Sequence, residues 1–127
     1  MDKGGINISV QTDGKRVMLE AFGGVALSCA LYDEFGDEID DVEYPDYERQ
    51  VVSWTYDGVN IILNATQTGG IVAEFSVPIG TIKYVGFLNA IGDELYLKHD
   101  LDMEAETFNN PGIYQVIAAS LELDPEV

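Results

Sequence analysis

The chain has 127 residues, of which 46% are hydrophobic, and its 23 acidic and 6 basic side chains give a formal net charge of −17. This length suits one domain, and the apolar content excludes a disordered acidic tail, which lacks the surface to offset the entropy of ordering. Six lysines and arginines are too few to form a basic face, so we expect no direct binding to nucleic acid and none to an anionic membrane. We therefore expect a single acidic domain over residues 1–127.

The N-terminal sequence and the cysteine content give no sign of export. Residues 1–5 precede alternating rather than continuous apolar residues, so the sequence holds no signal-peptide core and no stretch that could span a bilayer. The single cysteine, Cys29, lies in an apolar run and is expected to be a small buried hydrophobe. We expect the protein to be made and folded in a cytoplasm.

The first segment of the chain has a two-residue periodicity. Apolar and polar residues alternate over residues 6–10, and the dipeptide Asp13-Gly14 follows as a turn signal. Residues 16–22 form a second candidate strand beyond this turn. The sequence therefore predicts an N-terminal β-hairpin over residues 1–22.

Apolar runs separated by turn residues continue along the chain. Residues 25–32 are apolar almost throughout, which indicates a central strand buried on both faces. Alternating runs at residues 51–56 and 59–65 flank the dipeptide Asp57-Gly58, which is the strongest short signal of a hairpin. Further candidate strands lie at residues 71–77, 81–88, 94–99 and 113–123.

This spacing of strands determines the predicted fold class. Short strands with Gly, Asp and Pro at their junctions are typical of antiparallel sandwiches and small barrels. We predict an all-β fold, an antiparallel β-sandwich or small barrel of about 8–9 strands. A long acidic loop interrupts the strands at residues 33–48, and residues 100–111 form a second irregular segment that has room for one helical turn.

The acidic loop holds nine of the 23 acidic side chains. Calcium binds several oxygen ligands, but the acids here lack the spacing of an EF-hand, so we expect a solvated loop, with a calcium-assisted loop as the alternative. Arg49 follows the loop directly, and its guanidinium can hold carboxylates or backbone carbonyls and so fix the loop onto the sheet. The other interpretation of Arg49 is a plain surface ion pair. The calcium candidates are Asp33, Asp37, Asp40 and Asp41.

No residue pattern in the sequence points to catalysis. Paired catalytic carboxylates must converge in a pocket, and a crowded solvated loop gives no sign of one. The lone histidine, His99, ends a predicted strand and has no nucleophile motif to act with. Phosphate-binding, dinucleotide and zinc motifs are missing from the sequence. We expect no enzymatic activity, no catalytic residue and no cofactor.

Two motifs stand out in the middle of the chain. Residues 47–54 follow the pattern Tyr-x-Arg-Gln-x-Val-x-Trp, and residues 80–87 follow Gly-Thr-Ile-x-x-Val-Gly-Phe. These motifs resemble those of the small bacteriophage virion structural proteins of the tail-fibre-like type. An apolar strand precedes these motifs and a leucine-rich strand follows them, so the similarity covers residues 25–123. The family begins with an amphipathic helix, whereas residues 1–22 here predict a hairpin. The candidates for core packing or interface contacts are Tyr47, Arg49, Gln50, Trp54, Gly80, Gly86 and Phe87.

The resemblance implies a virion structural component without catalytic activity, in the tail fibre, baseplate, neck or head surface as a decoration protein. We expect its partners to be other virion proteins and further copies of itself. Strand edges suit such assembly, because they offer unpaired N–H and C=O groups to a neighbouring chain. The high negative charge would keep free subunits in solution before they assemble.

Two other functions stay open from the sequence. The net charge and the carboxylate-dense segments 33–48 and 93–106 suit an acidic inhibitor, such as a DNA mimic or an immunity protein, that binds a basic partner. A carbohydrate-binding module is the lesser alternative. Sugar sites favour exposed aromatic rings beside carboxylates and amides, and Tyr44, Tyr47 and Trp54 lie near such groups in the sequence.

Overall fold

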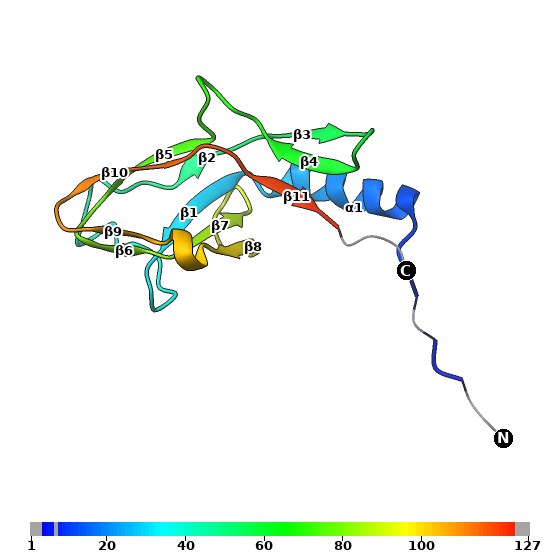
Figure 1. Cartoon of the computed structure of the whole chain (residues 1–127), viewed down its shortest axis with the longest axis horizontal. Coiled ribbons are helices and arrows are strands. Elements are labelled where there is room, and N and C mark those ends of the chain that lie inside the picture. The colour runs from blue at the N-terminus through cyan, green and yellow to red at the C-terminus, as the bar shows by residue number, and fades with distance from the viewer. Residues whose placement is uncertain (1–3, 7, 124–127) are drawn as a thin grey trace.

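The computed structural model describes residues 4–6 and 8–123, and Figure 1 shows their arrangement. This part of the chain has eleven short strands, one α-helix and one 3₁₀-helix, and its strand pairs are antiparallel. The predicted all-β, sandwich-like fold is thus confirmed. The elements are α1 (Thr12–Val25), β1 (Ser28–Tyr32), β2 (Gln50–Val51), β3 (Trp54–Asp57), β4 (Ile62–Ala65), β5 (Ala73–Val77), β6 (Gly80–Ile82), β7 (Tyr84–Leu88), β8 (Leu95–Asp100), η1 (Asp102–Glu104), β9 (Glu106–Phe108), β10 (Gly112–Val116) and β11 (Ser120–Glu122).

The strands form four sheets along an elongated molecule. A four-stranded sheet, in the order β2-β1-β7-β8, occupies one end together with the strand pairs β10-β5 and β6-β9. A three-stranded sheet, β11-β4-β3, occupies the other end, where β3 and β4 pack against α1 (Figure 1). The outer strands β8 and β11 therefore each form a free edge of their sheets.

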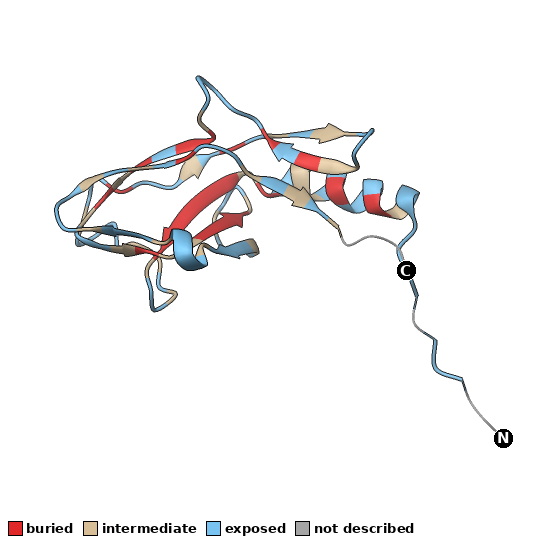
Figure 2. Ribbon diagram, in the orientation of Figure 1, coloured by how far each residue is buried: buried red, intermediate tan, exposed pale blue. Residues whose placement is uncertain are grey.

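The main core lies on one face of the four-stranded sheet. Every residue of β1 is buried, as the continuous apolar run of residues 25–32 predicts, and Figure 2 shows buried residues concentrated on β1 and β7. Leu31 packs in the same cluster as Phe75 and Val77 of β5. Side chains alternate across a strand, so Ala30 and Tyr32 lie on the opposite face, where they form a smaller cluster with Leu88.

The predicted hairpin at Asp57 is confirmed. β3 pairs with β4 in the register Trp54↔Ala65 to Asp57↔Ile62. The Asp57 carboxylate accepts hydrogen bonds from the backbone N–H groups of Val59 and Asn60, which closes the connection. The loop is longer than a two-residue turn, and it brings the chain back through Ile61 with a φ of 56°.

The predicted N-terminal hairpin is wrong, because residues 12–25 form the helix α1 instead. Asp13-Gly14, which the sequence suggested as a turn, lies in the first turn of the helix, where an acidic side chain is favoured by the helix dipole. Leu19 is buried, and Gly23 lies close to Leu63 of β4. Packing against the neighbouring sheet therefore favours a helix over a strand in this segment. Residues 4–6 and 8–11 belong to no strand, and the hairpin residues 1–3 and 7 lie outside the described residues. In the described part of the chain, no helix has the length and apolar character needed to cross a membrane.

The strand count also differs from the prediction, because three predicted strands each contribute to two sheets. The predicted strand 51–56 divides at residues 52–53, where β2 pairs with β1 and β3 pairs with β4. The predicted strand 81–88 divides at Lys83, where β6 pairs with β9 and β7 pairs with β1 and β8. The predicted strand 113–123 divides at residues 117–119, where the chain passes from β5 to β4. The short strand β9 and the 3₁₀-helix η1 fall in the segment 100–111 that the sequence indicated as irregular.

Candidate functional site

Arg49 joins the acidic loop to the loop between β7 and β8. Its Nε donates a 2.8 Å hydrogen bond to Oε2 of Glu38, and its Nη2 binds Oε1 of the same carboxylate. Nη1 donates a 2.8 Å hydrogen bond to the carbonyl oxygen of Gly92. The guanidinium therefore makes the forked contact that the sequence suggested, and it ties residues 38 and 92 to the start of β2.

Tyr47 extends this network into the core. Its side chain is only 2% exposed, and its ring stacks on Phe75 with 6.0 Å between centroids. The hydroxyl accepts a hydrogen bond from the Leu31 N–H and donates one to Oε2 of Glu38. Burial raises the pKa of Tyr47, so the hydroxyl stays protonated and keeps donating to Glu38. We call the hydrogen-bonded network of Glu38, Tyr47 and Arg49 the clasp. Its role is structural, since its polar groups are all engaged in hydrogen bonds within the protein.

Glu38 carries the charge that holds the clasp together. Burial acts to raise the pKa of this carboxyl, but the hydrogen bonds from Arg49 and Tyr47 outweigh it and hold the pKa below its usual range. A carboxyl whose pKa is lower in the folded chain adds stability that is complete above its ordinary pKa of 4.5 and is lost as the pH falls through the folded value.

We therefore expect Glu38→Gln to unfold at lower urea concentration than the wild type near neutral pH, because the substitution removes the charge but keeps the shape. The gap in unfolding free energy should be widest above about pH 5 and should close as the pH falls below about 4.5. Urea unfolding at several pH values measures it. Glu34→Gln, an exposed change in the same loop, is the control for general relief of negative charge. A gap that is independent of pH would contradict the assigned role of Glu38.

The calcium candidates do not converge. The Asp33 carboxylate accepts hydrogen bonds from the backbone N–H groups of Phe35 and Asp37, and the Asp40 carboxylate accepts them from Val42 and Glu43. These two side chains therefore organise turns within the loop. Among the described residues, no three His, Cys, Asp or Glu side chains gather as a metal site.

Among the remaining sequence candidates, the structure brings Trp54 and Phe87 into contact. Trp54 donates its indole N–H to the carbonyl oxygen of Ala26 at 2.7 Å and meets the Phe87 ring edge-on, with 5.0 Å between centroids. Gly86, in β7, lies under the ring of Tyr32. Gly80 is the first residue of β6 and has a φ of +140°. The side-chain amide of Gln50, in β2, donates a hydrogen bond to the backbone carbonyl oxygen of Glu48.

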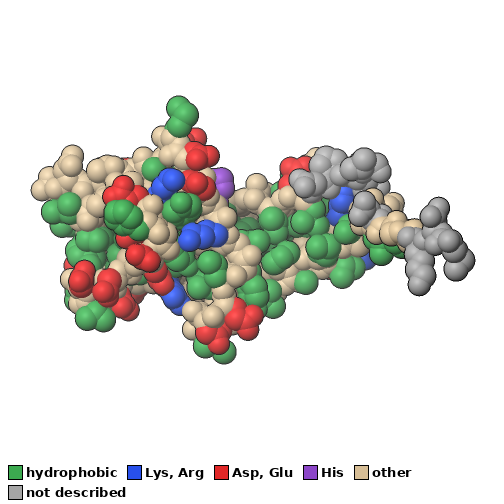
Figure 3. Space-filling model, turned by 90° about the horizontal axis from the view of Figure 1, so that it is seen from below, with side chains coloured by type: hydrophobic (Ala, Val, Ile, Leu, Met, Phe, Trp, Pro, Cys, Tyr) green, Lys and Arg blue, Asp and Glu red, His purple; other side chains and the backbone are tan. Residues whose placement is uncertain are grey.

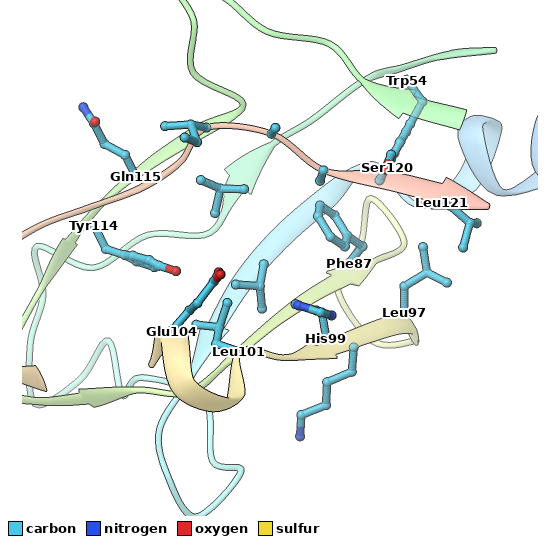
Figure 4. Close-up of a pocket in the computed structure, with 16 residues that line it drawn as sticks. Trp54, Phe87, Leu97, His99, Leu101, Glu104, Tyr114, Gln115, Ser120 and Leu121 are labelled. Carbon is cyan, nitrogen blue, oxygen red and sulfur yellow. The ribbon is translucent and has the colours of Figure 1, made fainter. Parts of the chain in front are cut away.

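An open groove, not indicated by the sequence, runs between β8 and the segment that contains β10 and β11. It encloses about 630 Å³. Figure 4 shows Phe87, Leu97 and Leu121 pointing into it from β7, β8 and β11. Trp54 closes the end nearest α1. Polar residues also line the groove, namely Lys98, His99, Glu104, Tyr114, Gln115 and Ser120. The Lys98 ammonium group is turned away from it, over the rings of Tyr32 and Tyr84.

The groove is bounded by strand edges. β8 ends the four-stranded sheet and β11 ends the three-stranded sheet, so each lacks a neighbouring strand on its outer side within the described chain. An edge strand presents backbone N–H and C=O groups without ladder partners. The groove therefore combines an apolar floor with backbone groups that can pair with an added strand. We call it the edge groove.

The sequence analysis found only part of this site. Trp54 and Phe87 were candidates, but Leu97 and Leu121 were not singled out, because each fits a strand pattern like many other leucines. Comparison with known proteins adds no relative: no protein-family model, no curated protein and no solved structure matches this chain.

Proposed function

We propose that this chain is a non-enzymatic structural protein of a bacteriophage virion, and that it acts by assembling with other virion proteins and with copies of itself. The observation that carries the proposal is the edge groove, in which an apolar floor lies between two free strand edges. Such a surface suits the addition of a strand from a neighbouring chain, since main-chain hydrogen bonds give affinity and the floor receives alternate side chains.

The order of elements supports the same proposal. The two motifs that resemble the tail-fibre-like proteins both fall on strands, with residues 47–54 at β2 and β3 and residues 80–87 at β6 and β7, and β4 and β5 lie between them. That family begins with an amphipathic helix, and α1 precedes β1 here. The helix α1 therefore supports the proposal in place of the predicted hairpin, while the long acidic loop and the net charge of −17 still exceed what the family pattern requires.

The charge on the face of the molecule that Figure 3 shows does not have the pattern expected for the acidic-inhibitor alternative. A DNA mimic needs carboxylates in a continuous row that imitates a phosphate backbone. On the face that Figure 3 shows, the acidic side chains form separate groups with hydrophobic, Lys and Arg side chains between them. The net charge of −17 then has the simpler role of keeping free copies apart until they assemble.

The carbohydrate alternative rests on three rings, Tyr44, Tyr47 and Trp54, and the structure removes one of them. Tyr47 is buried, its ring is stacked on Phe75, and its hydroxyl is engaged by Leu31 and Glu38. A sugar platform needs an exposed ring face. Tyr47 does not offer one.

The test is incorporation into particles. We expect quantitative mass spectrometry of gradient-purified phage particles, washed at high salt, to find this chain at a constant ratio to the other virion proteins. An abundant acidic host protein measured in the same sample is the control for carry-over. If the chain is lost with the host protein during the wash, the virion proposal is wrong.

A further inference from the structure

The N-terminal arm, residues 4–11, has the sequence pattern of a strand but pairs with nothing in the described chain. Ile6, Ile8 and Val10 alternate with polar residues, and they are 81%, 84% and 39% exposed. Residues 4–6 and 8–11 belong to no helix or strand. Apolar residues at every second position share one face of an extended chain. The arm therefore offers an apolar strand face that its own domain covers only in part, at Val10.

The edge groove is the matching acceptor. Phe87 and Leu97 point from β7 and β8 toward β11, and Leu121 points back toward them (Figure 4). Ile6 to Val10 in an extended chain span about 13 Å, which is shorter than the six-residue edge of β8, about 20 Å long. A strand of this length fits along β8 and places its apolar face on the groove floor.

We propose that the N-terminal arm of one copy adds as a strand to the free edge of β8 in a second copy, with Ile6, Ile8 and Val10 on the floor of the edge groove. This inference rests on the proposed assembly function and specifies how the copies assemble: one copy donates a strand and the next copy accepts it. A head-to-tail contact of this kind repeats from copy to copy and gives a ring or a filament.

The length of α1 prevents the arm from reaching the groove of its own chain, so the acceptor is a second copy. The helix has 14 residues and is about 21 Å long. The groove lies at its far end, where Trp54 binds the carbonyl oxygen of Ala26. Ile6 stands five residues before Gln11 and reaches at most about 18 Å from it. The arm is therefore too short to place its three apolar side chains in the groove of its own chain, and Figure 1 shows it leaving α1 away from the sheets.

Charge also suits the arm to this role. Two copies that each carry −17 repel one another, but residues 4–11 include no charged side chain. The arm can approach a like-charged body without adding to the repulsion. Screening by salt should then strengthen the association, since it weakens the repulsion between bodies and leaves apolar burial in place.

Light scattering of the full chain over a range of protein and salt concentrations tests the proposal. We expect the wild type to self-associate more strongly as either concentration rises. Ile8→Asp should weaken association at least about tenfold, because an apolar side chain is replaced by a charge in the groove. Ser9→Asp adds the same charge on the other face of the arm and should change association much less. Equal effects of the two substitutions would overturn the proposal.

Cysteine pairing locates the contact. We expect a mixture of Ile8→Cys and His99→Cys chains, oxidised with glutathione disulfide, to give a disulfide-linked heterodimer. Mixing Ile8→Cys with Val59→Cys is the control, since Val59 is 90% exposed at the distant β3–β4 turn. The native Cys29 should not compete, because burial raises its pKa to about 12. A disulfide within one chain of the Ile8→Cys/His99→Cys double variant, and none between chains, would overturn donation to a second copy.

The outcomes separate this inference from the proposed function. If the chain is found in particles but is monomeric under all conditions, or if Ile8→Asp associates like the wild type, strand donation is wrong and the virion proposal stands. If the chain is absent from particles but self-associates through Ile8, the virion proposal is wrong and strand donation stands.

Discussion

Phe75→Ala is expected to destabilise the protein by roughly 3–5 kcal/mol, a large share of the stability of a domain of this size. Phe75 is 1% exposed in β5 and is the largest fully buried side chain of the described residues. It stacks on Tyr47, whose hydroxyl holds the Leu31 N–H and Glu38, so the cavity would open beside the clasp. Urea unfolding followed by tryptophan fluorescence measures the loss.

Phe35→Ala is the matched control for this prediction. Phe35 lies in the acidic loop and is 81% exposed, so the same truncation there should change the unfolding free energy by less than about 0.5 kcal/mol. The expected contrast between the two variants comes from burial alone, because the chemistry of the substitution is identical. Similar losses in both variants would mean that β5 does not supply the centre of the core.

The core strands could be predicted because their burial is visible in the order of residues. The apolar run at residues 25–32 contains β1, which is buried on both faces, and the dipeptide Asp57-Gly58 marked the β3–β4 connection. In each case the local pattern and the tertiary packing favour the same structure. The sandwich-like fold class followed from these segments.

The helix α1 could not be predicted with the same rules, because the spacing of its apolar residues fits both a strand and a helix. Val17, Leu19 and Ala21 alternate as in a strand, whereas Leu19 and Phe22 also lie on one face of a helix. Packing decides between the two: Leu19 is buried, and Gly23 allows the helix to approach Leu63. That contact lies 40 residues away in the sequence and leaves no local signal.

The candidate site was predictable only in part for a related reason. The position of Arg49 beside the acidic loop indicated a carboxylate partner, but the choice of Glu38 and the bond to Gly92, 43 residues away, depend on the fold. The edge groove is lined by Trp54, Phe87, Leu97 and Leu121, which lie on four strands. Each of these residues fits an ordinary core position, and only the topology brings them to one surface.

Gly86→Ala is expected to destabilise the protein by about 1–3 kcal/mol, although it adds a single methyl group. A Cβ at this position would lie 2.6 Å from Cε2 of Tyr32 and 2.9 Å from Cδ1 of Leu95. Leu95 is partly exposed and can move, but the Tyr32 ring is 7% exposed and packs under the Lys98 ammonium group, which lies 4.6 Å from its centroid. The ring must shift, which disturbs the pairing of β1 with β7 at the centre of the sheet.

Gly24→Ala is the matched control, because the same substitution there is expected to raise stability rather than lower it. Gly24 lies in α1, and a Cβ there would meet no atom within 4 Å. Alanine is the better helix former, so this variant should be more stable than the wild type, by up to about 1 kcal/mol. Thermal unfolding of the two variants should therefore move in opposite directions. The same close packing that excludes a methyl group at Gly86 holds β7 and β8 in place, and β8 is the edge on which an added strand would have to pair. A parallel rise in both melting temperatures would show that the Tyr32 ring has room to move and would contradict this prediction.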